Sequence, residues 1–303
     1  MHLAAGALRT PRTLRRALSA ATVVLLAVAV GCAPQPAENA ENASDKASGS
    51  PQKTCAPGKL ETETTGKLTI ATDEPAYEPW FKDDDPASGQ GFESAVAYAV
   101  AERLGYGEGD VVWQTVPFNK AFAPGDKTFD FDINQVSISE ERRKAVDFSS
   151  GYYDVRQAVV ALKDSPAAKA TSVADLKDVK LGAQVGTTSL DHIHDVVRPE
   201  QEAAAFAKND QAKSALQNGQ VDAIVVDLPT AFYITAAEVT DARIVGQFEN
   251  RGGAVEQFGL VLDKGSALTP CVTDAVDALR EDGTLAEIEK KWLSDAVDAP
   301  VLR

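Results

Sequence analysis

Three polar residues stand where they could hold a small charged molecule. Arg142 carries a guanidinium, which can pair with a carboxylate through two parallel hydrogen bonds. Thr188 lies at an expected strand-to-helix junction, where free backbone N–H groups favour anions. Asp227 ends an apolar segment, and an unpaired buried carboxylate is costly, so a cationic group is its natural partner. On composition alone, the favoured interpretation of Arg142 is still one of several solvated charges between residues 140 and 144.

Strands and helices that alternate from residue 67 onward must position these residues. Apolar runs predict strands at 67–72, 111–116, 131–136, 157–162, 181–185, 221–226 and 258–262. Gly91 is expected to open a helix whose buried stripe recurs every four residues from Phe92 to Leu104. Further helical stretches are expected at 140–146, after Gly186, at 211–218 and twice near the C-terminus, and Ser172 with Asp175 resembles a capping box. The pattern predicts an α/β fold with connections suited to parallel sheets.

Several motifs in a fixed order resemble a known family. They include Ser137-Ile-Ser-Glu-Glu-Arg142, Gly186-Thr-Thr-Ser189 and Val221-Asp-Ala-Ile-Val-Val-Asp227, together with segments at 68–73, 77–80, 91–93, 146–153, 175–177 and 282–292. Over about residues 66–293 the chain is similar to the polar amino-acid-binding, type II extracytoplasmic solute-binding proteins (family 3). The resemblance implies two lobes, a ligand cleft between them, and two hinge crossings near 154–157 and 246–257. Lobe 1 would hold residues 66–155 and 256–303, and lobe 2 residues 156–255.

The same resemblance assigns roles to individual residues. Arg142 matches the arginine that binds the ligand carboxylate. Because Ser-Ile-Ser precedes it and Asp-Phe-Ser follows it, as in the family, the ligand-binding interpretation is now favoured over that of a solvated charge. Thr188 would anchor that carboxylate from the other lobe, although capping the following helix is a compatible role. Asp227 matches the acid that binds the α-ammonium group. Ser137 matches a hydroxyl that contacts the ligand's main-chain groups, whereas Ser139 better suits a plain capping role.

Other family positions concern the ligand side chain. Tyr77 and Phe118 match aromatic residues that sandwich it, and Asp73 matches a position used either for a cationic side chain or for a loop-closing bond. Asn134 and Gln135 depart from the pattern, because the family usually has small residues there. Either amide could donate or accept hydrogen bonds, which predicts a ligand with a polar side chain.

The N-terminal region indicates export. Four arginines and an apolar run too short to span a membrane are typical of a signal peptide over residues 1–31. The run ends in Ala29-Val30-Gly31-Cys32, which resembles a bacterial lipobox in which Cys32 receives lipid. An ordinary secreted protein with a stray cysteine is the alternative. Residues 32–65 lack apolar periodicity and are expected to form a flexible tether.

Charge and cysteine count narrow the partners. The formal charge is −15, and removal of the four signal arginines leaves 26 basic and 45 acidic residues, a charge of −19. That balance argues against binding to nucleic acid or to anionic lipid surfaces. With Cys32 lipidated, Cys55 and Cys271 remain as a candidate disulfide in an oxidising compartment, the alternative being two unrelated thiols.

These observations predict a lipid-anchored binding protein on the outer face of the cell membrane. It would capture a polar amino acid, act as a monomer without a cofactor, and deliver its ligand to an ABC importer permease. One alternative is a dehydratase-like enzyme acting on a carboxylate substrate on the same fold. A metal-binding lipoprotein is the other, suggested by His192 and His194. On a helix, however, those side chains would point about 200° apart and could not share an ion.

Overall fold

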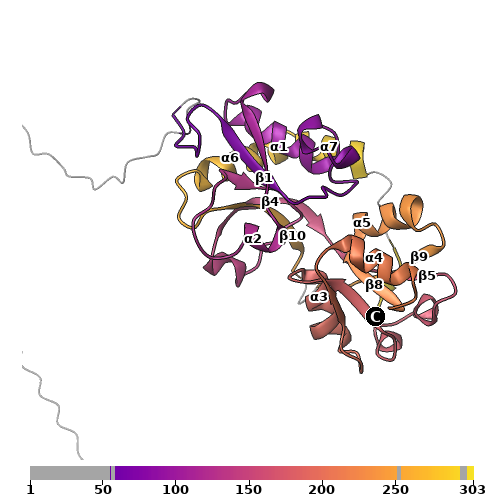
Figure 1. Cartoon of the computed structure of the whole chain (residues 1–303). Helices are drawn as coiled ribbons and strands as arrows, with labels where there is room; N and C mark the ends of the chain where they lie inside the picture. Colours follow the sequence, from indigo (N-terminus) through magenta and orange to yellow (C-terminus); the bar gives the residue numbers. More distant parts are fainter. Residues whose placement is uncertain (1–54, 56–58, 251–253, 294–298) are drawn as a thin grey trace, which may run out of the picture. The chain divides into compact units, whose positions relative to one another are not determined.

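The computed structural model describes residues 55, 59–250, 254–293 and 299–303. The expected signal peptide, Cys32 and most of the expected tether lie outside these residues. Two β-sheets organise the described part of the chain, and we call each sheet with its helices a lobe (Figure 1).

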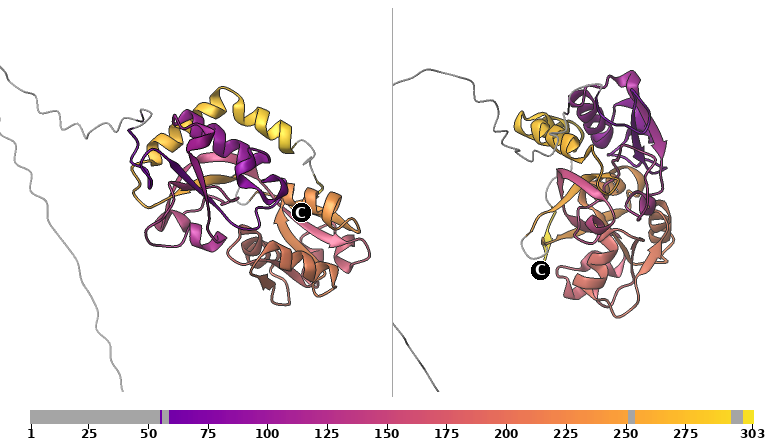
Figure 2. Two further views of the ribbon diagram at one scale, coloured as in Figure 1. Left: turned by 45° about the horizontal axis from the view of Figure 1, so that its top comes forward. Right: turned by 90° about the vertical axis from the view of Figure 1, so that its left-hand side faces the viewer.

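Lobe 1 is built on a five-stranded sheet in the order β2-β1-β3-β10-β4. Its strands are β1 (Leu68–Thr72), β2 (Val111–Thr115), β3 (Phe131–Asp132), β4 (Asp147–Val155) and β10 (Glu256–Leu262). The helices of this lobe are α1 (Phe92–Arg103), α2 (Phe118–Ala121), α6 (Thr269–Glu281) and α7 (Thr284–Leu293). Figure 2 shows the yellow α6 and α7 beside the violet α1, and contacts join all three helices.

Lobe 2 is built on a six-stranded sheet in the order β11-β9-β5-β8-β6-β7. Its strands are β5 (Gln157–Leu162), β6 (Leu181–Gln184), β7 (Ala204–Phe206), β8 (Ala223–Asp227), β9 (Ala242–Phe248) and β11 (Val301–Leu302). The helices of this lobe are α3 (Thr188–His192), α4 (Asn209–Gln217) and α5 (Leu228–Tyr233), and π-helical turns at Ile193–Val197 and Ile234–Glu238 extend α3 and α5. Separate apolar clusters cover the two faces of this sheet.

Both sheets are mixed rather than parallel. β1 runs parallel to β2 and β3, and β6 runs parallel to β7 and β8. β5 and β10, however, run antiparallel to their neighbours. β5 directly follows β4, and β10 directly follows β9, where the chain passes from one sheet to the other. The expected parallel pairing therefore holds for part of each sheet, and antiparallel pairs complete both sheets.

The helix predicted after Gly91 has the expected buried stripe. Phe92, Val96 and Val100 are fully buried, and Leu104 is nearly so. Gly91 has a φ of 95°, and a Cβ there would overlap the backbone of Trp80, so this helix start requires glycine.

Three predicted boundaries differ from the structure. The strand expected at 131–136 is only β3, because the backbone turns into the left-handed region at Gln135, where φ is 49°. The charged segment 140–146 holds a single 3₁₀ turn at Arg142–Lys144. The expected return of residues 256–303 to lobe 1 extends too far, because β11 pairs in parallel with β9 of lobe 2. The C-terminus accordingly lies with lobe 2 in all three views (Figures 1 and 2).

The N-terminal boundary of the folded body also lies earlier than predicted. Cys55 forms a disulfide with Cys271 on α6, with Cα atoms 5.4 Å apart. Leu60 packs on the core of lobe 1, and the backbone N–H of Glu63 donates to Asp130 at 2.8 Å. Residues 59–65 are therefore part of lobe 1 rather than of a tether. Among the described helices, none is long and apolar enough to span a bilayer.

The disulfide links residues 216 positions apart, so its loss should release much chain entropy in the unfolded state. We expect Cys55→Ser to lower the free energy of unfolding by about 2–4 kcal/mol, measured by urea denaturation. Cys271→Ser should have the same effect, and the double variant should be no less stable than either single variant. An unchanged urea midpoint in both single variants would contradict a stabilising role.

Candidate ligand-binding site

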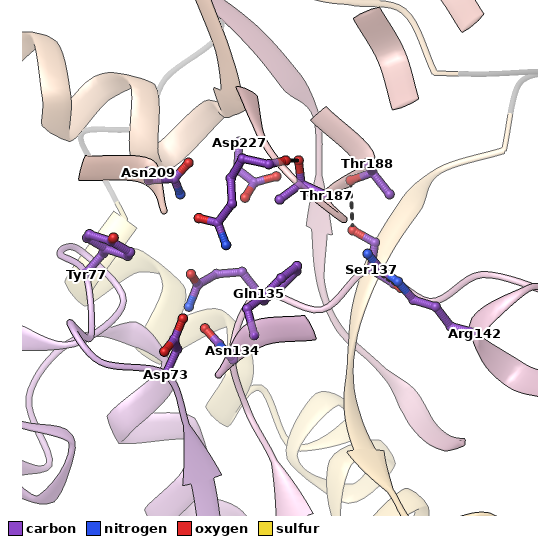
Figure 3. Close-up of a pocket in the computed structure, with 12 residues that line it drawn as sticks. Asp73, Tyr77, Asn134, Gln135, Ser137, Arg142, Thr187, Thr188, Asn209 and Asp227 are labelled. Carbon is purple, nitrogen blue, oxygen red and sulfur yellow. Dashed lines mark hydrogen bonds between the residues drawn. The ribbon is translucent and has the colours of Figure 1, made fainter. Parts of the chain in front are cut away.

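A pocket between the two lobes gathers the polar residues that the sequence singled out. Its empty volume, counting space open to solvent, is about 420 Å³. All nine residues predicted to bind ligand line it: Asp73, Tyr77, Phe118, Asn134, Gln135, Ser137, Arg142, Thr188 and Asp227. In Figure 3 the side chains of the two lobes face one another across this space.

Three further residues line the pocket that were not among the predicted ligand-binding residues. Gln184 is the last residue of β6, Thr187 precedes α3, and Asn209 is the first residue of α4. All three are polar residues at strand or helix ends on lobe 2. That position is the signal that could have found them, since ligands of α/β sheets bind outside the carboxyl ends of the strands.

Arg142 spans the space between the lobes. Its Nη1 donates to the carbonyl oxygen of Ser137 in lobe 1 at 2.6 Å, and its Nη2 donates to the carbonyl oxygen of Gly186 in lobe 2 at 2.8 Å. The guanidinium also stacks on the ring of Phe122, with its Cζ 4.3 Å from the ring centroid. Burial lowers the pKa of this guanidinium. Both acceptors of the Arg142 guanidinium are neutral carbonyl oxygens. They hold the guanidinium in place without neutralising its positive charge, which is available to an anion in the pocket.

Local hydrogen bonds set the turn that carries Arg142. The Ser139 hydroxyl accepts from the backbone N–H of Arg142 at 3.1 Å, the capping role expected for Ser139 rather than for Ser137. The Ser137 hydroxyl is thereby free to face lobe 2. It donates to Glu256 at 2.6 Å and lies 3.3 Å from the hydroxyl of Thr188 (Figure 3).

The start of α3 supplies Thr188 to the same region. Thr187, not Thr188, is the N-cap, because its hydroxyl accepts from the backbone N–H of Leu190 at 3.2 Å. The Thr188 side chain therefore points to the pocket, where Gln157 Nε2 lies 3.3 Å from its hydroxyl. Gln157 is fully buried at the start of β5, and Ser189 donates to its carbonyl oxygen at 2.6 Å.

Asp227 is the last residue of β8, and few neighbouring groups stabilise the negative charge of its carboxylate. Gln157 Nε2 donates to its Oδ1 at 2.7 Å. Burial, with nearby Glu256 adding repulsion, raises the pKa of Asp227 to about 7, although Gln157 and Arg142 oppose that shift. A carboxylate in this position gains from a cationic partner, since such a partner would restore its ionised form. Asp222, the other acid of this segment, lies outside the pocket and accepts from the backbone N–H of Lys180 at 2.7 Å.

Asn134 and Gln135 lie where β3 gives way to the left-handed turn. Asn134 is buried, and its Nδ2 has no hydrogen-bond partner among the described residues. Gln135 donates from its backbone N–H to Glu93 Oε1 at 2.7 Å and from its side-chain Nε2 to Glu93 Oε2. Burial raises the pKa of Glu93, a fully buried residue of α1, to about 7. Glu93 thus fixes the direction of the Gln135 side chain.

The aromatic residues and Asp73 close the remaining walls. The Tyr77 ring has Lys213 Nζ 5.6 Å from its centroid, and burial with nearby Asp210 raises the pKa of its hydroxyl. Phe118 is buried edge-on against Phe122, with ring centroids 5.1 Å apart. Asp73 Oδ1 accepts from the backbone N–H of the next residue, Glu74, at 2.7 Å, a local bond that decides between neither of the two roles predicted for Asp73. One carboxylate oxygen of Asp73 is thus in local use.

Trp80 packs rather than lining the pocket. It is fully buried, and its Nε1 donates to the Thr230 hydroxyl of α5 at 2.9 Å. His192 places its Nδ1 2.9 Å from the carbonyl oxygen of Thr188. Within the described ranges, no group of three histidine, cysteine or acidic side chains forms a metal site.

Comparison with known proteins decides the family. A sequence model of the bacterial extracellular solute-binding proteins, family 3, matches residues 68–295. The chain belongs to this family.

Curated relatives of this solute-binding protein support that assignment. The ABC transporter glutamine-binding protein GlnH of Bacillus subtilis is 31% identical over 218 residues, covering 70% of this chain and 76% of GlnH. The L-cystine-binding protein TcyJ of Escherichia coli is 29% identical over 222 residues, covering 72% of this chain and 80% of TcyJ.

Solved structures agree with the fold. An ancestral arginine-binding protein bound to glutamine has a TM-score of 0.63 at 31% identity, covering 76% of this chain and 98% of its own. An ancestral amino acid-binding protein, a precursor of cyclohexadienyl dehydratase, has a TM-score of 0.62 at 30% identity, covering 75% and 95%. The predicted two-lobed α/β fold is confirmed.

The raised pKa of Asp227 makes a prediction about stability. Its folded pKa of about 7 exceeds its ordinary value of 3.8, so the folded protein resists ionisation of this carboxyl. The free energy of unfolding therefore falls progressively as the pH rises from about 4 to 7. Asp227→Asn cannot ionise and can still accept from Gln157. We expect it to raise the melting temperature of ligand-free protein at pH 8 by ~2 °C or more, with no gain at pH 4.

Differential scanning calorimetry at both pH values tests this expectation. Asp164→Asn, an exposed position outside the pocket, is the matched control and should leave the melting temperature unchanged. A lower melting temperature of Asp227→Asn at pH 8 would show that the carboxylate stabilises the ligand-free protein, contrary to the argument.

Proposed function

We propose that this protein captures a polar amino acid outside the cytoplasmic membrane and delivers it to an ABC importer. The observation that carries the proposal is one pocket with a fixed guanidinium and a poorly compensated carboxylate. A free amino acid has a carboxylate and an ammonium group on one carbon, and these two groups complement that pair. The names of the relatives, which include glutamine- and cystine-binding proteins, support the same ligand class.

Each main-chain group of the ligand has a proposed partner. The carboxylate pairs with Arg142 and accepts from Thr188 and from the free N–H groups at the start of α3. The ammonium group donates to Asp227, which then stays ionised. Ser137 contacts the same end of the ligand. Tyr77 and Phe118 enclose the ligand side chain, whose polar atoms face Asp73, Asn134 and Gln135.

Closure of the two lobes is the proposed mode of capture. The chain passes between the sheets at Arg156, which joins β4 to β5, and between β9 and β10. We propose that the lobes predicted from the sequence move as units, 66–155 with 256–303 and 156–255, with one correction: β11 moves with lobe 2, so the return to lobe 1 ends with α7. Bonds from Arg142 to Gly186 and from Trp80 to Thr230 join the lobes in the closed form that docks on the permease.

Binding without catalysis is the role that the pocket favours. Arg142 and Asp227, charged residues of its lining, each have a proposed partner in a main-chain group of a free amino acid, so neither is left to serve a reaction. The dehydratase alternative keeps one argument, the resemblance to a precursor of cyclohexadienyl dehydratase. That neighbour is itself named an amino acid-binding protein.

A thermal-shift screen against the twenty amino acids tests the function. At least one polar amino acid should raise the melting temperature, and Arg142→Ala should abolish that rise, because the carboxylate loses its charged partner. Arg143→Ala is the matched control, since the neighbouring arginine is exposed and lies outside the pocket. Stabilisation by none of the amino acids, or undiminished binding by folded Arg142→Ala, would refute the proposal.

Lipid anchoring at Cys32 is a separate part of the proposal, supported by the lipobox-like sequence before it. Wild-type protein expressed in a bacterial host should partition into the detergent phase of Triton X-114 and incorporate labelled palmitate. Cys32→Ala should stay in the aqueous phase without label, since it lacks the thiol that is modified. Equal partition of the two proteins would exclude the anchor and leave the binding function untouched.

A further inference from the structure

The start of α4 in lobe 2 meets the loop that follows β1 in lobe 1, beside the pocket. Lys208, the residue before α4, donates from its Nζ to the carbonyl oxygen of Glu74 in that loop. Lys213 of α4 places its Nζ 5.6 Å from the centroid of the Tyr77 ring. Asn209 and Tyr77 both line the pocket, and Figure 3 shows them on the same side of it. The two lobes therefore touch each other at a wall of the pocket itself.

Tyr77 belongs to lobe 1 by its backbone and extends its side chain toward lobe 2. Its carbonyl oxygen accepts from the backbone N–H of Phe81 at 3.0 Å, and its ring packs at the edge of the lobe 1 core. Burial raises the pKa of its hydroxyl, and repulsion from nearby Asp210 of α4 adds to the rise. The surroundings of the outer part of this side chain are therefore completed by lobe 2.

Lys213 is held by its own lobe. Its Nζ lies 2.8 Å from an oxygen of Asp210, one turn earlier on α4, and 2.5 Å from an oxygen of Glu238, in the turn that extends α5. The Lys213 side chain is 13% exposed. Both ion pairs are within lobe 2, so closure of the lobes neither makes nor breaks them. Holding a long side chain in one rotamer costs entropy, and these two pairs offset that cost already in the open form.

The Tyr77 ring attracts this ammonium group. A cation within about 6 Å of an aromatic centroid is drawn to the electron-rich face of the ring, more strongly as water is excluded. Lys213 is not one of the described lining residues of the pocket, whereas Tyr77 is. The ammonium group thus acts on the wall and not on the ligand. With its ring held from lobe 2, Tyr77 cannot turn away from a bound ligand until the lobes separate.

We propose that Lys213 is a positioning residue for ligand capture, which holds the Tyr77 ring in the pocket wall after closure and thereby slows release of the bound amino acid. The inference rests on the amino-acid-binding function and on the lobe closure proposed above. It predicts an effect on release that is shared by all amino acids that bind, because Lys213 contacts the wall and not the ligand.

Titration of variants tests this role. Each of the twenty L-amino acids is titrated into ligand-free wild-type protein, and every one that binds is then titrated into Lys213→Met, which lacks the charge. Isothermal titration calorimetry measures the dissociation constant, and stopped-flow tryptophan fluorescence measures the rates. The dissociation constant should rise at least threefold through faster dissociation, with the association rate within twofold of wild type. Lys213→Gln takes the place of Lys213→Met if the latter does not fold.

Two further variants separate the ring contact from the ion pairs. Lys213→Arg keeps a cation and should restore the wild-type dissociation constant within twofold. Glu238→Gln is the matched control, because it removes one ion pair of Lys213 and leaves the ammonium group and the ring in place. It should change the dissociation constant less than twofold. A loss in Glu238→Gln as large as that in Lys213→Met would show that Lys213 acts only by joining α4 to α5, and it would overturn the inference.

A double-mutant cycle with Tyr77 identifies the partner. Tyr77→Phe keeps the ring, so Lys213→Met should weaken binding by the same factor in that background. Tyr77→Leu removes the ring, and Lys213→Met should then have no further effect. If Tyr77→Leu binds too weakly to titrate, Tyr77→Phe and Lys213→Arg decide.

The outcomes separate this inference from the function on which it rests. A loss below threefold in folded Lys213→Met would overturn the inference alone. So would a loss that persists in Tyr77→Leu, that disappears in Tyr77→Phe, or that Lys213→Arg does not restore. Binding of none of the twenty amino acids to wild-type protein would refute the function and the inference together.

Discussion

A buried carboxylate, Asp227, that forms no salt bridge with any described residue is the constraint on which the cleft depends. Asp227 is fixed by its place at the end of β8, and its local compensation is one amide hydrogen from Gln157. Gln157 in turn lies within reach of Thr188, Glu256 and Ser189, so one buried amide connects the facing surfaces of both lobes. The network aligns the pocket, yet it leaves the negative charge for a ligand to neutralise. Binding sites commonly retain such costs, because a fully compensated carboxylate would gain little from a cation.

Much of this site followed from the sequence, because the motifs that carry chemistry are local. Arg142, Ser137 and Ser139 share one short segment, and their roles as guanidinium, pocket hydroxyl and cap agree with the geometry. The identity of the cap at α3 was less certain, since adjacent threonines offer the same hydroxyl. Only the backbone geometry shows that Thr187 caps the helix and releases Thr188.

The features that the sequence did not predict depend on long-range pairing. A two-residue strand at the C-terminus has no periodicity to detect, and Val301–Leu302 becomes a strand only because β9 offers a free edge. Buried Glu93 likewise belongs to a helix whose apolar stripe marks other positions, and its partners Gln135 and Tyr152 come from distant segments. The early end of β3 is a third case, since an apolar run does not reveal a left-handed residue within it.

The disulfide between Cys55 and α6 has a mechanical consequence. Any pull on the chain preceding residue 55 is transmitted through a covalent bond to the helical layer of lobe 1. The covalent attachment lies on a helix of lobe 1 and not on lobe 2, so the lobe closure proposed above would leave this attachment in place.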